Sequence, residues 1–256
     1  MTPLIYSPKP GEREQQLAVQ TGLSICNEWL SDQHQQYLFY HQDCLSVGLS
    51  PAQREHPVCV DFAALLGNRQ RGKELLLKAI GGRQPGMQIV DATAGLGRDS
   101  ALLASYGAQV TLCERNPVVA ALLQDGLLRG EQSAPDIAEI VSRMTLIRDS
   151  ASHYLNSINE QEKPGIIYLD PMFPESGKSA LVKKEMRLFH DLVGKDDDAD
   201  ELLALALQKA EYRVVVKRPP KAPVLGEARA DLPRPQLAVA GKAVRFDLYP
   251  LKALPK

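Results

Sequence analysis

The sequence predicts an α/β fold in which helices cover both faces of a mostly parallel, seven-stranded sheet with an antiparallel edge. Strand-like and helix-like segments alternate from residue 58 onward, as in consecutive right-handed βαβ units. The runs IIYLD at 166–170 and YRVVVK at 212–217 are largely apolar, as expected of strands that are covered on both faces. The last two β segments have no helix between them, which indicates the antiparallel edge.

Local signals support most of these elements. The predicted strands are 58–62, 87–91, 109–114, 143–148, 166–170, 212–217, 236–239 and 243–249. The predicted helices are 73–80, 98–106, 117–129, a short one after residue 150, one near 178–193 and 200–210. Gly81 and Gly82 end the first of these helices, and Pro117 stands in the first turn of the third. Asp149 and Ser150 are good N-cap residues.

The length of 256 residues fits one large domain with a modest extension. We predict an N-terminal extension or small subdomain over 1–56, where no motif is recognisable, and the main domain over 57–256. No apolar run approaches the roughly 20 residues of a membrane-spanning helix. The first residues, MTPLIYSPKPGEREQQ, lack the basic and apolar regions of a signal peptide. We therefore expect a soluble, cytoplasmic protein without membrane attachment.

A glycine-rich loop follows the predicted strand 87–91, in the stretch DATAGLGRD. Ligands of doubly wound sheets bind at the carboxyl ends of the strands, close to the switch in strand order. Gly95 and Gly97 allow a tight turn and a close approach of the backbone to a ligand. We predict that Asp91, Gly95 and Gly97 bind a cofactor, although glycine loops also serve to pack a helix on a strand.

Two further strand ends carry polar residues suited to a nucleoside. Glu114, at the end of the second strand of the series, can accept hydrogen bonds from both ribose hydroxyls. Asp149 and Ser150 follow the next strand and are placed to meet an adenine amino group. A solvated acid at a strand end is the alternative interpretation of Glu114.

The loop favours S-adenosylmethionine over a dinucleotide. The dinucleotide pattern G-x-G-x-x-G needs a third glycine, but Ser100 occupies that position. Asp99 would also disfavour a pyrophosphate at the helix N-terminus. The methionine part of S-adenosylmethionine carries an ammonium and a carboxylate, which Asp99 and Arg98 can bind.

The predicted strand 166–170 ends in Leu-Asp-Pro-Met-Phe-Pro, the most specific signal in the chain. It resembles the [DNS]-P-P-[YFW] loop of methyltransferases that act on amino groups. We predict that the Asp170 carboxylate and the Pro171 carbonyl accept the two N–H bonds of an aromatic amine, so that its lone pair faces the methyl group. Phe173 would stack on the target base. Met172 replaces the second proline of the pattern, and an acid before a proline-rich turn is the structural alternative.

Basic residues follow the last two strand ends of the parallel series. The net charge is −6 over residues 1–177 and +5 over 178–256. Nucleic-acid phosphate contacts are the functional interpretation of this asymmetry, and solvated helix faces are the alternative. The candidate phosphate-binding residues are Lys178, Lys183, Lys184, Arg187, Lys217 and Arg218.

The four cysteines have no disulfide-scaffold spacing. Two H-x-x-C pairs, His41 to Cys44 and His56 to Cys59, contain residue types that bind zinc. Cys59 nevertheless lies in the strand-like run Val-Cys-Val, where a buried thiol is ordinary core. We expect no metal.

With these motifs together, the sequence resembles the bacterial ribosomal RNA small subunit methyltransferase J family over about residues 58–250. The matching stretches are DATAGLGRD (91–99), ERNPVVAALLQDGL (114–127), YLDPMFP (168–174), KSALVKKEMR (178–187), VVVKRP (214–219) and RFDLY (245–249). The resemblance implies a class I, Rossmann-like methyltransferase fold. It also implies methyl transfer from S-adenosylmethionine to the N2 amino group of a guanosine in 16S rRNA, alone or in the small ribosomal subunit.

The resemblance further implies cofactor contacts at six positions, namely Arg98, Asp99, Glu114, Arg115, Ser150 and Asp170. Two other functions stay open. An amino methyltransferase acting on DNA or a protein side chain would share the chemistry of the catalytic loop. A non-catalytic RNA-binding assembly factor would share the fold, but the intact Asp170 and Phe173 argue against it.

Overall fold

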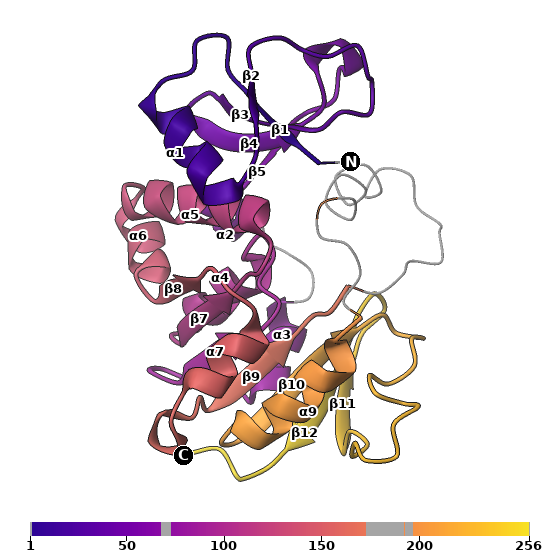
Figure 1. Cartoon of the computed structure of the whole chain (residues 1–256). Helices are drawn as coiled ribbons and strands as arrows, with labels where there is room; N and C mark the ends of the chain where they lie inside the picture. The colour runs from indigo at the N-terminus through magenta and orange to yellow at the C-terminus, as the bar shows by residue number, and fades with distance from the viewer. Residues whose placement is uncertain (1, 68–72, 173–191, 193–196, 256) are drawn as a thin grey trace.

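The structure is a computed structural model that describes residues 2–67, 73–172, 192 and 197–255. Its larger sheet has seven strands in the order β11-β12-β10-β9-β6-β7-β8 (Figure 1). The strands are β6 (Gln88–Asp91), β7 (Gln109–Cys113), β8 (Met144–Ile147), β9 (Ile166–Leu169), β10 (Arg213–Arg218), β11 (Leu237–Ala240) and β12 (Arg245–Pro250). The five strands from β10 to β8 are parallel, and β12 pairs antiparallel with both β10 and β11. The predicted parallel sheet with an antiparallel edge is confirmed.

Both faces of this sheet are covered, which explains its apolar central strands. All four residues of β9 are buried, as are Val214, Val215 and Val216 of β10. One face packs against α2 (Phe62–Gly67), α3 (Lys73–Ile80), α4 (Arg98–Ser105), α5 (Pro117–Glu131) and α6 (Pro135–Val141). The other packs against α7 (Ala151–Ser157) and α9 (Ala199–Lys209). The sheet pairs β6 with both β7 and β9, so the chain changes direction across the sheet at β6, where ligands of this architecture bind.

The N-terminal residues form a second, five-stranded sheet in the order β2-β1-β3-β4-β5. Its strands are β1 (Leu4–Tyr6), β2 (Ile25–Cys26), β3 (Tyr37–His41), β4 (Cys44–Gly48) and β5 (Val58–Cys59), with α1 (Glu12–Thr21) after β1. This sheet lies beside α5 in Figure 1, and the Leu45 amide donates to the Asp125 carboxylate of α5 at 3.1 Å. Ile5, Leu38 and Val47 belong to the same buried cluster as one face of the larger sheet.

One predicted strand differs from the structure, and one predicted helix is not tested by it. The predicted strand 58–62 ends at Cys59 and pairs with β4 of the small sheet. It stops there because Asp61 accepts a hydrogen bond from the Ala64 amide at 2.9 Å, and this contact begins α2 at Phe62. The helix near 178–193 lies outside the described residues except for residue 192. The short helix α6, which sequence reasoning missed, begins with Pro135 in its first turn.

Candidate active site

The glycine loop and Glu114 bind each other at the carboxyl ends of β6 and β7. Gly95 and Gly97 have φ angles of 53° and 70°, in the left-handed region that favours glycine. A Cβ on Gly97 would lie 2.8 Å from Leu123 Cδ1 of α5. The Gly95 amide donates to Glu114 Oε2 at 3.0 Å, and the Asn116 amide donates to Oε1 at 2.7 Å. The loop therefore wraps around a carboxylate that is only 6% exposed.

Asn116 fixes the start of the helix behind this carboxylate. Its side-chain oxygen accepts from the Val118 and Val119 amides, which makes it the N-cap of α5. Glu114 is thereby held at the end of β7, and a carboxylate at this position is the type of acceptor that binds ribose hydroxyls in nucleotide sites.

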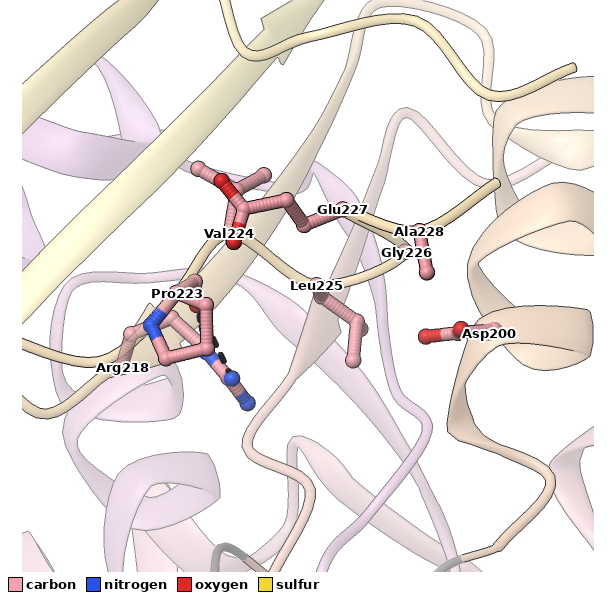
Figure 2. A pocket seen from close by; sticks show the side chains of 8 residues that line it. All are labelled: Asp200, Arg218, Pro223, Val224, Leu225, Gly226, Glu227 and Ala228. Atoms are coloured by element: carbon pink, nitrogen blue, oxygen red, sulfur yellow. Dashed lines mark hydrogen bonds between the residues drawn. The ribbon is translucent and has the colours of Figure 1, made fainter. Parts of the chain in front are cut away.

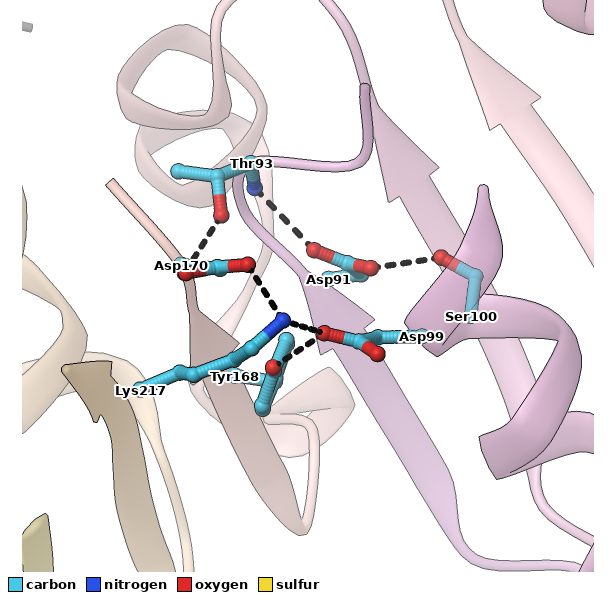
Figure 3. A network of polar contacts seen from close by, with 7 residues as sticks. All are labelled: Asp91, Thr93, Asp99, Ser100, Tyr168, Asp170 and Lys217. Atoms are coloured by element: carbon cyan, nitrogen blue, oxygen red, sulfur yellow. Dashed lines mark hydrogen bonds and ion pairs between the residues drawn. The ribbon is translucent and has the colours of Figure 1, made fainter. Parts of the chain in front are cut away.

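A polar network joins the glycine loop to the predicted catalytic loop (Figure 3). Lys217 Nζ, near the end of β10, lies 2.7 Å from Asp99 Oδ2 and 2.7 Å from Asp170 Oδ2. The Tyr168 hydroxyl donates to the same Asp99 oxygen at 2.6 Å. The Asp170 amide donates to Thr93 Oγ1 at 2.6 Å. Two contacts thus fix the backbone and the side chain of Asp170 separately.

Asp91 is the most buried acid of the network, with 1% of its surface exposed. The Ser100 hydroxyl donates to its Oδ2 at 2.5 Å, and the Thr93 amide donates to its Oδ1 at 3.2 Å. Burial raises the pKa of Asp91 to about 7, against the effect of the Ser100 hydroxyl. Asp91 therefore holds the start of α4 through Ser100 and the glycine loop through Thr93.

The charge of this network suits S-adenosylmethionine better than a dinucleotide. Two carboxylates, on Asp99 and Asp170, lie beside one ammonium group, on Lys217, and the buried Asp91 adds a third carboxyl group to the network in Figure 3. An excess of carboxylates attracts a cofactor that carries a sulfonium and an ammonium group, whereas it repels a pyrophosphate. The residues present therefore fit the methyl donor.

The remaining predicted cofactor residues lie at the ends of β7 and β8 or begin α4. Ser150 is the N-cap of α7 and accepts from the His153 amide at 3.1 Å. The Asp149 carboxylate pairs with His153, and this hydrogen bond lowers the pKa of Asp149. Arg115 Nη1 lies 2.7 Å from Asp198 Oδ2, and Arg98 is exposed at the first position of α4. Their roles in cofactor binding stay predictions.

The structure gives two of the predicted phosphate-binding residues other contacts. Lys217 directs its ammonium to Asp99 and Asp170 rather than to solvent. Arg218 is 4% exposed, and its guanidinium donates to the Pro223 carbonyl at 3.0 and 3.1 Å, which leaves little of it for a phosphate (Figure 2). The surface pocket beside it is lined by Asp200, Arg218, Pro223, Val224, Leu225, Gly226, Glu227 and Ala228. The predicted Phe173, Lys178, Lys183, Lys184 and Arg187 lie outside the described residues.

Sequence reasoning missed the supporting residues Thr93, Ser100 and Tyr168. Thr93 and Ser100 flank the glycines of the loop. Their position near Asp91 in the sequence and their hydroxyl groups could have indicated that they bind its carboxylate. The sequence pattern indicates that Tyr168 is an ordinary buried strand residue, but its hydroxyl donates a hydrogen bond to Asp99 on α4. Strand periodicity gave the only signal for Tyr168, because it places residues 168 and 170 on the same face of the sheet.

The structure shows neither a metal cluster nor a membrane span in the part that it describes. Within residues 2–67, 73–172, 192 and 197–255, no group of three or more His, Cys, Asp or Glu side chains is arranged to hold a metal ion. In the same part of the chain, no helix is long and apolar enough to cross a membrane.

Comparison with known proteins places this site in a family. The SAM_MT family model, which describes a SAM-dependent methyltransferase, matches residues 18–251. A ribosomal RNA small subunit methyltransferase J of Pseudomonas paraeruginosa is 50% identical over 207 residues, which are 78% of this chain and 76% of the relative. The enzyme of that name from Thioalkalivibrio sulfidiphilus is 44% identical over 93% of this chain and 92% of its own. This chain belongs to the ribosomal RNA small subunit methyltransferase J family.

A solved structure supports the same assignment. The crystal structure of a SAM-dependent methyltransferase from Neisseria gonorrhoeae has a TM-score of 0.75 and 34% identity, and the match covers 97% of this chain and 96% of that one. The predicted family, the class I methyltransferase fold and the cofactor are confirmed. The chain is a methyltransferase that uses S-adenosylmethionine.

Proposed function

We propose that this methyltransferase modifies the N2 amino group of a guanosine in the RNA of the small ribosomal subunit. The observation that carries the proposal is the double fixation of Asp170, by Thr93 at its amide and by Lys217 at its carboxylate. The relatives named above support the RNA as substrate through their names. The guanine and its N2 atom come from the family resemblance alone.

The exocyclic amine of guanine is a poor nucleophile, because its lone pair is delocalised into the ring. The Asp170 carboxylate and the Pro171 carbonyl would accept its two N–H bonds, which holds the nitrogen near tetrahedral geometry. S-adenosylmethionine, when bound, supplies a methyl group on a sulfonium, whose S–C bond breaks as the C–N bond forms. The product nitrogen then releases one proton to water. Orientation of the amine supplies most of the rate in this scheme.

Glu114 would bind the ribose of the cofactor, and Asp99 would face its methionine part. Both carboxylates are held in advance, Glu114 by the Gly95 amide and Asp99 by the Tyr168 hydroxyl. Prior fixation lowers the entropy that is lost when the cofactor orders these side chains. Phe173 is the proposed stacking partner of the target base. The proposed contacts with RNA phosphates are Lys178, Lys183, Lys184 and Arg187.

The loop after β10 is a further candidate for contact with RNA phosphates. Two guanidinium groups hold its carbonyls: Arg218 binds that of Pro223, and Arg245 binds those of Pro220 and Ala222 at 3.0 and 3.1 Å. Lys221 is exposed on this fixed loop, at the same sheet edge as Asp170. A rigid loop with an exposed ammonium group fits the phosphate contacts that orient a nucleic acid.

We further propose that residues 1–56 form a small N-terminal subdomain and that the enzyme acts in the cytoplasm. Residues 1–56 supply four strands of the five-stranded sheet, whose last strand is Val58–Cys59. A substrate in the small ribosomal subunit supports the cytoplasm as the place of action.

Methyl transfer to defined acceptors tests the proposed function. The protein is incubated with radiolabelled S-adenosylmethionine and small subunits from cells that lack the modification, naked 16S rRNA, DNA or total protein. We expect label in RNA, and nuclease digestion should release it as N2-methylguanosine. Label in DNA or protein alone would overturn the proposal in favour of another amino acceptor. A lack of transfer to every acceptor would favour a non-catalytic assembly factor.

A further inference from the structure

Lys217 occupies a position that the register of the sheet determines. Val215 pairs with Tyr168 and Val216 pairs with Leu169, so the next residues along the two parallel strands are Lys217 and Asp170. Val215 and Tyr168 belong to the buried cluster on the α4 side of the sheet. Residues two positions farther along a strand point to the same face, so Lys217 and Asp170 both face α4.

The ammonium group of Lys217 lies between two carboxylates. It is 2.7 Å from Asp99 Oδ2 and 2.7 Å from Asp170 Oδ2, and the side chain is 29% exposed. Asp99 stands at the cofactor end of the site and Asp170 at the acceptor end. A lysine that serves as a mobile phosphate contact would extend into solvent, whereas this one is held on both sides (Figure 3).

We propose that Lys217 is a positioning residue that keeps the Asp170 carboxylate ionised and oriented toward the amine, and that ties it to Asp99. The inference deepens the proposed function, on which it rests for the identity of the amine. Lys217 donates to Oδ2 of Asp170, which directs the acceptor sites of Oδ1 toward an incoming N–H. The ammonium group acts on the carboxylate and does not touch the reacting atoms.

The electrostatics of the site explain why a cation is needed here. Two carboxylates that share a partly buried site repel each other, and one of them takes up a proton unless a cation separates them. Burial already raises the pKa of Asp170, and Lys217 opposes this effect. Burial also disfavours the charged lysine, but Asp170 and Asp99 outweigh it and hold the pKa of Lys217 above its ordinary value. The ammonium therefore stays charged at physiological pH.

Protonation would weaken Asp170 as an acceptor. A protonated carboxyl is neutral and turns one acceptor site into an O–H donor, so it accepts an N–H of the amine less strongly than a carboxylate does. The Lys217 ammonium opposes the rise in the pKa of Asp170 that burial causes. In the proposed scheme the carboxylate orients the amine, and the proton of the product is released to water.

A titration of the cofactor-free protein tests this role without reference to any substrate. The protein is labelled with 13C at the aspartate carboxyls, and the Asp170 signal is assigned by its loss in Asp170→Asn. In Lys217→Met we expect the Asp170 midpoint to rise by at least one pH unit, which is about a tenfold change in the ionisation equilibrium. Lys217→Arg should keep the midpoint near that of the wild type. Lys217→Gln keeps an N–H donor but has no charge, so it should raise the Asp170 midpoint as Lys217→Met does. It provides a second test of the lost charge if Lys217→Met fails to fold.

Lys252→Met serves as the matched control for loss of a lysine charge. Lys252 is 66% exposed and pairs with Glu211 beyond the end of β12, at the opposite edge of the sheet. It should leave the Asp170 midpoint unchanged. An unchanged midpoint in both Lys217→Met and Lys217→Gln would overturn the proposal, and so would a large shift in Lys217→Arg.

The pH dependence of turnover gives a second measurement. In Lys217→Met the acidic limb of kcat should move to higher pH, with a rate that falls about tenfold per pH unit below the new midpoint. A uniform loss at every pH, with no movement of the limb, would contradict the positioning role. Failure to methylate rRNA in the wild type would overturn the proposed function but would leave the 13C titration valid.

Discussion

The Gly95 amide donates a hydrogen bond to Glu114 Oε2 at 3.0 Å, across the gap between the loop after β6 and the end of β7. This contact joins the glycine loop to the carboxylate that we propose as the ribose-binding group. The left-handed φ of Gly95 turns its amide toward β7, which a residue with a Cβ would do only at a cost in backbone strain. Glycine at position 95 is therefore needed for the orientation of its amide toward Glu114.

Glu114→Gln should weaken the binding of S-adenosylmethionine by roughly 10- to 100-fold, because hydrogen bonds to a charged acceptor contribute about 1.5–3 kcal/mol. The neutral amide also loses an acceptor oxygen for the Gly95 or the Asn116 amide. Calorimetric titration measures the affinity. Glu131→Gln, an exposed position at the end of α5, is the control and should bind as the wild type does. Equal affinity in the two variants would refute the ribose contact.

Gly97→Ala should destabilise the fold and impair cofactor binding. Its φ of 70° costs about 1–2 kcal/mol for an alanine, and the new Cβ would lie 2.8 Å from Leu123 Cδ1. Gly86 has a similar φ of 75°, but a Cβ there would meet nothing within 4 Å, so Gly86→Ala carries the backbone strain alone. We expect a larger loss in Gly97→Ala by urea denaturation. Equal losses would mean that the contact with Leu123 relaxes freely.

Asp91→Asn should change how stability depends on pH. Burial raises the pKa of Asp91 to about 7, so between about pH 4 and 7 the folded state binds a proton that the unfolded state has released. Stability from this group is therefore present at low pH and is lost as pH rises through 7. The effect is on the order of 4 kcal/mol, since one pH unit corresponds to about 1.4 kcal/mol.

Urea denaturation of the wild type and Asp91→Asn from pH 4 to 8 measures this dependence. From about pH 4 to 7 the unfolding free energy of the wild type should fall relative to that of Asp91→Asn, and the difference between the two proteins should level off above pH 7. A constant difference across the range would show that Asp91 does not titrate there.

Asp170→Ala should abolish methyl transfer and leave binding of S-adenosylmethionine largely intact. The carboxylate accepts the N–H of the target, whereas Glu114 holds the cofactor ribose in the proposed site. A filter-binding assay and a transfer assay on the same preparation separate the two effects. Full transfer activity in Asp170→Ala would refute the proposed mechanism.

The sequence by itself determined the α/β alternation and three of the acidic strand ends, Asp91, Glu114 and Asp170. These predictions succeed because they depend on local periodicity and on one rule: parallel strands in a sheet bring their carboxyl ends to one edge. Glycine spacing and the neighbouring Asp99 likewise favoured the methyl donor before any contact was known.

The tertiary structure alone decided what several side chains face. Lys217 and Arg218 are neighbours in sequence and were both predicted to bind phosphate. The alternation of β10 turns the first toward Asp170 and α4, and it turns the second toward the Pro223 carbonyl on the other face. Strand pairing also assembled the N-terminal sheet, whose short strands carry no periodic signal. Register and packing join residues far apart in the chain, so local pattern reveals the chemistry available at an edge but not which groups meet there.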